Sequence, residues 1–197
     1  MAKEKEIKTN AMRILDRQKI KYEVLQYECD EFIDGLHTAE KTGAPVEQSF
    51  KTLVAQGKSK QYYVLVLPIA EEVDLKKAAK AVGEKSIEMI HVKDITAVSG
   101  YVRGGCSPIG MKKQYPTVIQ ECAANFDKVY VSGGRIGTTL CMAPEDLKKV
   151  SRAEYADFRI KNRKNCMEAD QNEEKSSGLF LFTVMRLGNF FQKKIIK

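Results

Sequence analysis

Two glycine-rich segments and one lysine are the parts of this 197-residue chain whose residue types and spacing could do chemistry. Residues 100–110 contain four glycines and a proline, and residues 131–137 contain three glycines after an apolar stretch. Main-chain amides in such loops can approach a ligand closely, although each segment taken alone is more typical of a structural turn than of a ligand site. Neither segment has the Gly-Lys-Ser/Thr ending of a phosphate loop or the Gly-x-Gly-x-x-Gly spacing of a dinucleotide site.

Lys51 lies in the stretch 49–54, whose residues are typical of a β-strand. Strand alternation puts residues 49, 51 and 53 on one face, so Leu53 shares the face of Lys51. A half-buried lysine is costly unless it serves a ligand or a partner carboxylate. The pattern leaves two interpretations open, a solvent-facing lysine and a functional one.

The cysteines and histidines do not form a recognisable catalytic or metal-binding set. Five cysteines without a Cys-x-x-Cys pair, together with two histidines, lead us to expect no metal and no other cofactor. His37 and His91 lie far in sequence from the glycine-rich segments, and we expect neither to be catalytic. Cys106 lies inside the first segment, and packing is the favoured interpretation of its role. The odd cysteine count and the polar N-terminus predict a cytoplasmic protein.

The net charge of +7 is concentrated towards the ends of the chain. Residues 160–197 contain eight Lys and Arg against four Asp and Glu, and residues 3–21 contain seven against three. Basic ends suit an anionic partner such as RNA, but charge alone favours a solvated first helix and a solvated tail. No apolar run approaches the roughly 20 residues that span a bilayer, so we expect no membrane association.

The elements that must position these residues alternate irregularly between helices and strands. We expect helices near residues 10–19, 34–43 and 75–82 and from Pro144 onwards, and strands near residues 22–27, 49–54, 62–67, 117–119 and 128–131. The polar connection at residues 57–61 predicts an antiparallel hairpin. This order favours an α/β domain with a mixed sheet and flanking helices over a doubly wound parallel sheet.

The composition changes beyond about residue 160, where a polar stretch precedes a short apolar one. We therefore expect a single domain at residues 1–160 and a C-terminal extension at residues 161–197. The extension is expected to be poorly ordered or to form a peripheral helix.

Together, these features resemble the YbaK family of aminoacyl-tRNA deacylases, which is related to the editing domain inserted in bacterial prolyl-tRNA synthetases. The matching stretches are residues 50–53 (Phe-Lys-Thr-Leu), 74–83, 100–110 (with Gly-Gly-x-Ser-Pro-x-Gly) and 130–134. Their order and spacing agree from about residue 9 to 159. The family fold is a mixed, partly barrel-like sheet with surrounding helices, which matches the pattern of elements expected here.

The resemblance implies a Cys-tRNA(Pro) deacylase, an enzyme that clears cysteine mistakenly loaded on proline tRNA. It implies tRNA(Pro) as the substrate and prolyl-tRNA synthetase as an expected partner. It implies Lys51 as the catalytic residue. The substrate-binding residues that it implies are Tyr27, Gly104, Gly105, Ser132, Gly133 and Thr139. At Thr139 the chain departs from the family, which often has an aspartate there, so a hydroxyl replaces a full negative charge.

In the family the substrate's own thiol attacks its ester carbonyl and leaves as a cyclic thiolactone. The resemblance therefore implies that the protein supplies positioning and main-chain amides for the oxyanion rather than a nucleophile. Two alternatives stay open. One is a catalytically silent module that binds tRNA or a synthetase, which the departure at Thr139 and the extension favour. The other is an editing deacylase for another small amino acid such as alanine, with water as the nucleophile.

Overall fold

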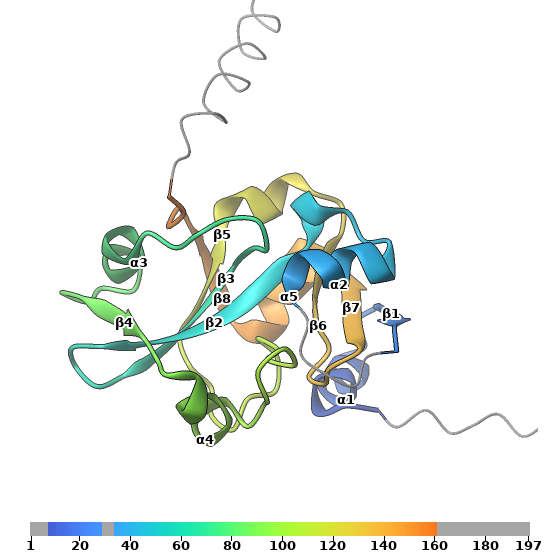
Figure 1. The fold of residues 1–197 in the computed structure, drawn as a ribbon, viewed down its shortest axis with the longest axis horizontal. Helices are drawn as coiled ribbons and strands as arrows, with labels where there is room; N and C mark the ends of the chain where they lie inside the picture. The colour runs from blue at the N-terminus through green and yellow to red at the C-terminus, as the bar shows by residue number, and fades with distance from the viewer. Residues whose placement is uncertain (1–7, 29–33, 161–197) are drawn as a thin grey trace, which may run out of the picture. The chain divides into compact units, whose positions relative to one another are not determined.

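The computed structural model describes residues 8–28 and 34–160, which form a mixed α/β domain (Figure 1). Within these ranges the strands form a three-stranded sheet in the order β1-β7-β6 and a five-stranded sheet in the order β4-β2-β3-β5-β8. The strands are β1 (Glu23–Gln26), β2 (Phe50–Gly57), β3 (Tyr62–Pro68), β4 (Ile87–Met89), β5 (Thr117–Gln120), β6 (Val129–Ser132), β7 (Thr138–Met142) and β8 (Ala153–Ala156). The extension expected at residues 161–197 lies outside the described residues.

Several helices begin or end at residues that are typical caps. The helices are α1 (Asn10–Arg17), α2 (Gly35–Thr42), α3 (Leu75–Ala81), α4 (Ile95–Ser99) and α5 (Pro144–Ser151), with single 3-10 turns at Val46–Gln48, Val92–Asp94 and Glu121–Asn125. Thr9 and Asp34 accept hydrogen bonds from main-chain amides in the first turns of α1 and α2, and Asp74 does the same for α3. Gly43 ends α2 in the left-handed conformation. The four predicted helices are confirmed.

The predicted mixed sheet is also confirmed. Strands β2 and β3 pair antiparallel, with Lys51 opposite Leu67, as the expected hairpin requires. Strand β3 pairs parallel with β5, and β5 pairs parallel with β8. Sequence patterns did not indicate β4, α4, β7 or β8. These elements have three to five residues, and every residue of β7 is buried, so it shows no polar–apolar alternation.

The core has two parts, which lie on opposite faces of β3 because successive side chains of a strand alternate. Val64 and Val66 pack with α1 and α5 in the larger part. Leu65 and Leu67 pack with α3 and Phe158 in the smaller part. The five-stranded sheet is therefore covered by helices on both faces. No helix in the described ranges is long and apolar enough to cross a membrane.

The outer edge of β2, on the side away from β3, is only partly paired. Strand β4 pairs with Ala55–Gly57, and the Ile90 amide donates to the Val54 carbonyl at 3.1 Å. At the other end, Ser49 forms a parallel bridge with Tyr130, which links the two sheets. Figure 1 shows β2 running from β6 on one side of the domain to β4 on the other. Between these contacts the sheet has an opening along residues 50–53.

Candidate active site

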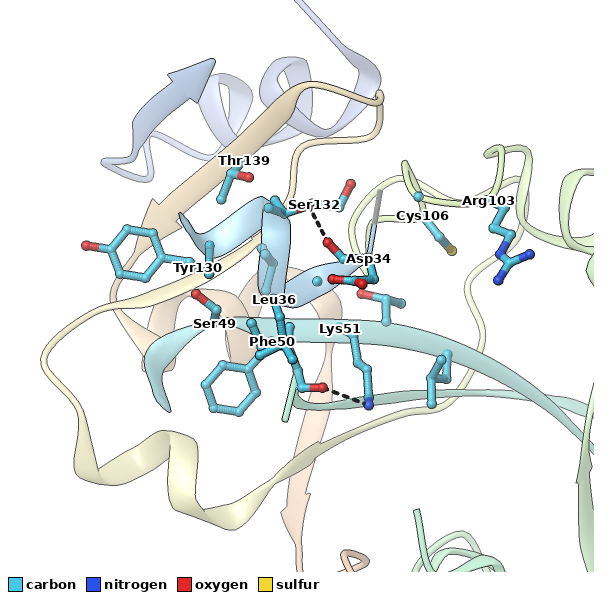
Figure 2. A pocket seen from close by; sticks show the side chains of 18 of the residues that line it. Asp34, Leu36, Ser49, Phe50, Lys51, Arg103, Cys106, Tyr130, Ser132 and Thr139 are labelled. Carbon is cyan, nitrogen blue, oxygen red and sulfur yellow. Dashed lines mark hydrogen bonds between the residues drawn. The ribbon is translucent and has the colours of Figure 1, made fainter. Parts of the chain in front are cut away.

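A pocket of about 630 Å³ lies at the opening along β2 (Figure 2). Helix α2, strand β2, the first glycine-rich loop and the ends of β6 and β7 all contribute to its walls. Five of the seven predicted site residues line it, namely Tyr27, Lys51, Gly104, Ser132 and Thr139. The topology thus brings together residues more than a hundred positions apart in the chain. The volume is in the range of natural small-molecule sites.

The ammonium group of Lys51 is held by main-chain carbonyls. Its Nζ donates to the carbonyl of Ile69 at 3.0 Å and to that of Glu71 at 2.5 Å. An ammonium has three N–H groups, so the third can serve a ligand. Burial lowers the pKa of Lys51, and the nearby carboxylates of Glu72 and Glu71 oppose that shift. Lys51 is therefore a half-buried, oriented cation in the pocket wall, and the solvent-facing interpretation does not describe it.

The main chain of Thr52 also faces the opening. The Ile69 amide donates to the Ser49 carbonyl, so alternate residues of β2 from Ser49 direct their main-chain groups towards β3. The residues between them, including Thr52, direct N–H and C=O to the outer edge, as the Val54 carbonyl bonded to Ile90 does. Thr52 thus offers a main-chain donor on the pocket side, which residue types alone do not reveal.

Ser132 and Thr139 lie directly opposite each other on neighbouring strands β6 and β7. Opposite residues of an antiparallel pair put their side chains on the same face. Tyr27 follows β1 and places its hydroxyl 3.3 Å from Oγ1 of Thr38 in α2. These residues form the wall of the pocket on the three-stranded sheet, and Thr139 contributes a hydroxyl to it.

Gly105 and Gly133 are not among the residues that line the pocket. A methyl group on Gly105 would lie 3.1 Å from the main-chain nitrogen of Ile136, so this glycine lets the two glycine-rich loops touch. A methyl group on Gly133 would lie 2.7 Å from Cγ2 of Thr138. Both glycines therefore permit close packing of the chain around the pocket.

Cys106 lines the pocket, but its environment suppresses its reactivity. Burial raises the pKa of its thiol to about 11, with a smaller opposing effect from the hydrogen bond with Ser99. The thiolate is the nucleophilic form of cysteine, and this shift keeps the thiol protonated near neutral pH. The geometry agrees with a packing role for Cys106.

Neither His37 nor His91 is among the residues that line this pocket. His37 is exposed on α2, where its Nδ1 lies 2.9 Å from Oδ2 of Asp34. Hydrogen bonds from the main-chain N–H and side chain of His37 lower the pKa of Asp34, and Asp34 raises the pKa of His37. Among residues 8–28 and 34–160, no group of three or more His, Cys, Asp or Glu side chains is placed to hold a metal ion.

Arg103 is a pocket residue that the sequence did not single out. It lies in the first glycine-rich loop, is exposed, and lines the pocket together with Lys51. Figure 2 shows its guanidinium beyond Cys106, on the loop side of the opening. An exposed arginine in a loop has no distinctive pattern, so only its place beside the pocket identifies it.

Comparison with known proteins identifies the family. The model of the aminoacyl-tRNA editing domain matches residues 36–150. A protein of Enterococcus faecalis (strain ATCC 700802 / V583), provisionally named Cys-tRNA(Pro)/Cys-tRNA(Cys) deacylase EbsC, is 42% identical over 163 residues, which is 82% of this chain and 99% of that protein.

Solved structures agree on the fold. A crystal structure described provisionally as a trans-editing enzyme for prolyl tRNA synthetase has a TM-score of 0.68 at 22% identity, covering 79% of this chain and 100% of that one. The crystal structure of a hypothetical protein, APE2540, has a TM-score of 0.71 at 18% identity, covering 77% and 100%. The expected fold is thus confirmed, and the chain belongs to the aminoacyl-tRNA editing domain family.

Proposed function

We propose that this protein is a trans-acting deacylase that removes cysteine from mischarged Cys-tRNA(Pro). The observation that carries this proposal is the Lys51 ammonium, fixed by two carbonyls in a pocket that no described histidine lines. Such a pocket lacks the Ser-His or Cys-His pair of a hydrolase that forms a covalent intermediate. The named activity of the Enterococcus relative supports the choice of substrate.

The substrate can supply its own nucleophile. The sulfur of the esterified cysteine attacks its own carbonyl carbon, the bond from that carbon to the ribose oxygen breaks, and a thiolactone leaves. The thiol proton ends on the ribose hydroxyl, so no cofactor or external reactant is needed. The protein has to hold sulfur and carbonyl at near-attack distance and stabilise the oxyanion.

The pocket residues suit these tasks. The main-chain amide of Thr52 on the open edge and those of the loop at Gly104 are suitable donors for the oxyanion. The third N–H of Lys51, beyond the two bonded to carbonyls, is suited to the ribose oxygen or the phosphate of the terminal adenosine. Arg103 adds a second cation on the loop side, which suits the phosphate backbone of an acceptor end. Ser132 and Thr139 supply hydroxyls for the amino group of the substrate.

Selection of cysteine follows from the same chemistry. Serine in the pocket offers a hydroxyl, which is a much weaker nucleophile than a thiol, and alanine offers none. We infer that discrimination resides in the reaction more than in binding. We further propose that tRNA(Pro) is presented with the help of prolyl-tRNA synthetase and that the protein works in the cytoplasm.

A panel of charged tRNAs tests the proposal. Cys-, Ser- and Ala-charged tRNA(Pro) and Cys-tRNA(Cys) are incubated with the protein, ester loss is measured, and the product from cysteine is trapped as the thiolactone. We expect fast loss of Cys-tRNA(Pro) with thiolactone release and slow loss of the serine and alanine esters. Binding without ester loss would instead show a silent tRNA-binding module. Fast loss of Ala-tRNA(Pro) would show a water-dependent deacylase of different specificity.

A further inference from the structure

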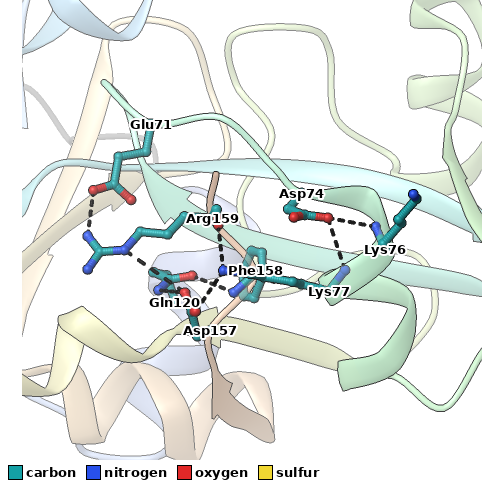
Figure 3. A network of polar contacts seen from close by, with 8 residues as sticks. All are labelled: Glu71, Asp74, Lys76, Lys77, Gln120, Asp157, Phe158 and Arg159. Carbon is teal, nitrogen blue, oxygen red and sulfur yellow. Dashed lines mark hydrogen bonds and ion pairs between the residues drawn. The ribbon is translucent and has the colours of Figure 1, made fainter. Parts of the chain in front are cut away.

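Glu71 connects the pocket lysine to the last described segment of the chain. Its main-chain carbonyl accepts the hydrogen bond from Nζ of Lys51 at 2.5 Å. Its carboxylate Oε1 lies 2.7 Å from Nη1 of Arg159, as Figure 3 shows. One residue thus touches Lys51 through its main chain and Arg159 through its side chain.

The loop that carries Glu71 is held by the same C-terminal segment over several residues. The Ile160 amide donates to the Glu72 carbonyl at 2.9 Å, and the Asp74 amide donates to the Phe158 carbonyl at 2.8 Å. Between these bonds Arg159 forms an antiparallel bridge with Val73. The loop connects β3 to α3 and is part of neither. Its conformation is therefore held by these contacts with the C-terminal segment.

The C-terminal segment is itself firmly anchored. The side chain of Phe158 is fully buried, and its amide donates to Oε1 of Gln120 at 3.0 Å. Asp157 accepts from Nε2 of Gln120 at 3.0 Å and pairs with Lys77 of α3 at 2.9 Å. The anchored segment therefore fixes the position of the Arg159 guanidinium relative to the loop.

We propose that Arg159 is a positioning residue for Lys51, acting through Glu71, whose carboxylate it binds and whose carbonyl orients the lysine ammonium. This inference rests on the proposed function, because it gives Lys51 a task in deacylation. Arg159 is not among the residues that line the pocket, so it acts on the reaction only through the loop.

Loss of Arg159 should disturb the loop because the Glu71 carboxylate is largely buried. Its side chain is 20% exposed, and its second oxygen, Oε2, has no hydrogen-bond partner in the described chain. A buried carboxylate that loses its cation is strongly unfavourable, and the side chain relieves this by turning towards water. That movement draws the Glu71 main chain away from Nζ of Lys51.

The expected kinetic signature is a fall in kcat with little change in KM. The pocket walls that bind the substrate stay intact in Arg159→Met, whereas a displacement of a catalytic group by about 1 Å costs on the order of 10- to 100-fold in rate. We expect kcat for Cys-tRNA(Pro) to fall by about that factor and KM to stay within about threefold. Arg159→Lys keeps one N–H for Glu71 and should restore part of the rate.

A second readout reports on Lys51 without turnover. The ¹⁵N–¹H signal of a lysine ammonium is visible by NMR when hydrogen bonds slow its proton exchange. The Lys51 signal, assigned by its loss in Lys51→Ala, should be present in the wild type and in Arg159→Lys and absent in Arg159→Met. Lys77→Met is the matched control, because it removes the ion pair with Asp157 and a hydrogen bond to the main-chain carbonyl of Arg159 but keeps the guanidinium that binds Glu71.

The outcomes separate the two proposals. Normal kcat and an unchanged Lys51 signal in a folded Arg159→Met protein would overturn the positioning role. Equal losses in Arg159→Met and Lys77→Met would overturn it too, since they would reflect general destabilisation. Normal turnover in Lys51→Ala would overturn the role of Lys51 itself, whatever Arg159 does. If Arg159→Met fails to fold, Glu71→Gln tests the same contact and should lower kcat in the same direction.

Discussion

Cys106 shows at the scale of a single residue how burial decides the chemistry of a side chain. It lies in the pocket wall, and sequence position alone makes it attractive as a nucleophile. Burial raises the pKa of its thiol to about 11, whereas a free cysteine has a pKa of about 8.5. A thiol that stays protonated at neutral pH suits a wall of the pocket better than a covalent catalyst.

We therefore predict that Cys106→Val retains most of the deacylation rate, because a valine fills the same space and the substrate brings its own thiol. The rate of ester loss from Cys-tRNA(Pro) measures this. A loss as large as that of Lys51→Ala in a folded protein would point to an enzyme-bound intermediate instead.

The raised pKa of Cys106 gives a separate prediction. At pH 8 only about one Cys106 thiol in a thousand is ionised, so alkylation by iodoacetamide should be slow and should accelerate as the pH rises towards 11. Mass spectrometry of the labelled peptide follows this residue alone. A rate that levels off near pH 8 or 9 would show an ordinary thiol pKa and contradict the burial argument.

At the scale of elements, the site depends on two loops that touch. Gly105 in one loop lies against the main chain of Arg135 and Ile136 in the other. We predict that Gly105→Ala pushes the loops apart, costs about 1–3 kcal/mol of unfolding free energy by overpacking, and lowers the deacylation rate. Denaturant unfolding and the rate of ester loss measure the two effects.

Gly83 provides the matched control for Gly105→Ala. It has a φ of +75° at the end of α3, and a methyl group there would meet nothing within 4 Å. Gly83→Ala should cost about 1–2 kcal/mol through left-handed strain and leave the rate unaffected. If the two variants slow the reaction equally, the loss tracks stability and the loop contact has no specific role.

The elements also show what the sequence could predict. Helices with clear caps, such as α2 between Asp34 and Gly43, were predictable because capping is local. Lys51 and the glycine-rich segments were recognisable from residue types and spacing, the family resemblance gave them roles, and the pocket lies beside all of them. The role of the Thr52 main chain was not predictable, because it depends on the outer edge of β2 having no neighbouring strand at that residue. Arg103 and Arg159 were missed because their significance lies in contacts between distant segments.

At the scale of the whole molecule, residues 161–197 carry much of the excess charge. The expected boundary near residue 160 stays a prediction. A protein truncated after Ile160 keeps Arg159 and the anchored segment, so we expect its melting temperature to change by less than about 5 °C and its deacylation rate to persist. A larger drop in melting temperature would show that the removed residues contribute to the core.

The same truncation tests the role of charge in tRNA binding. The extension, residues 161–197, has a net charge of +4, and contacts between its basic side chains and phosphates would release counterions. We expect the truncated protein to bind tRNA more weakly than the full chain at low salt and about equally at high salt. Equal affinity at both salt concentrations would show that the extension does not contact tRNA.

We propose that the ordered Lys51 ammonium in this pocket is required for the removal of cysteine from tRNA. The most direct measurement is the single-turnover rate of ester loss from Cys-tRNA(Pro) with the wild type and with Lys51→Ala, both checked for an unchanged melting temperature. We expect thiolactone release by the wild type and a rate at least about 100-fold lower for Lys51→Ala. A folded Lys51→Ala protein that releases cysteine at the wild-type rate would contradict it.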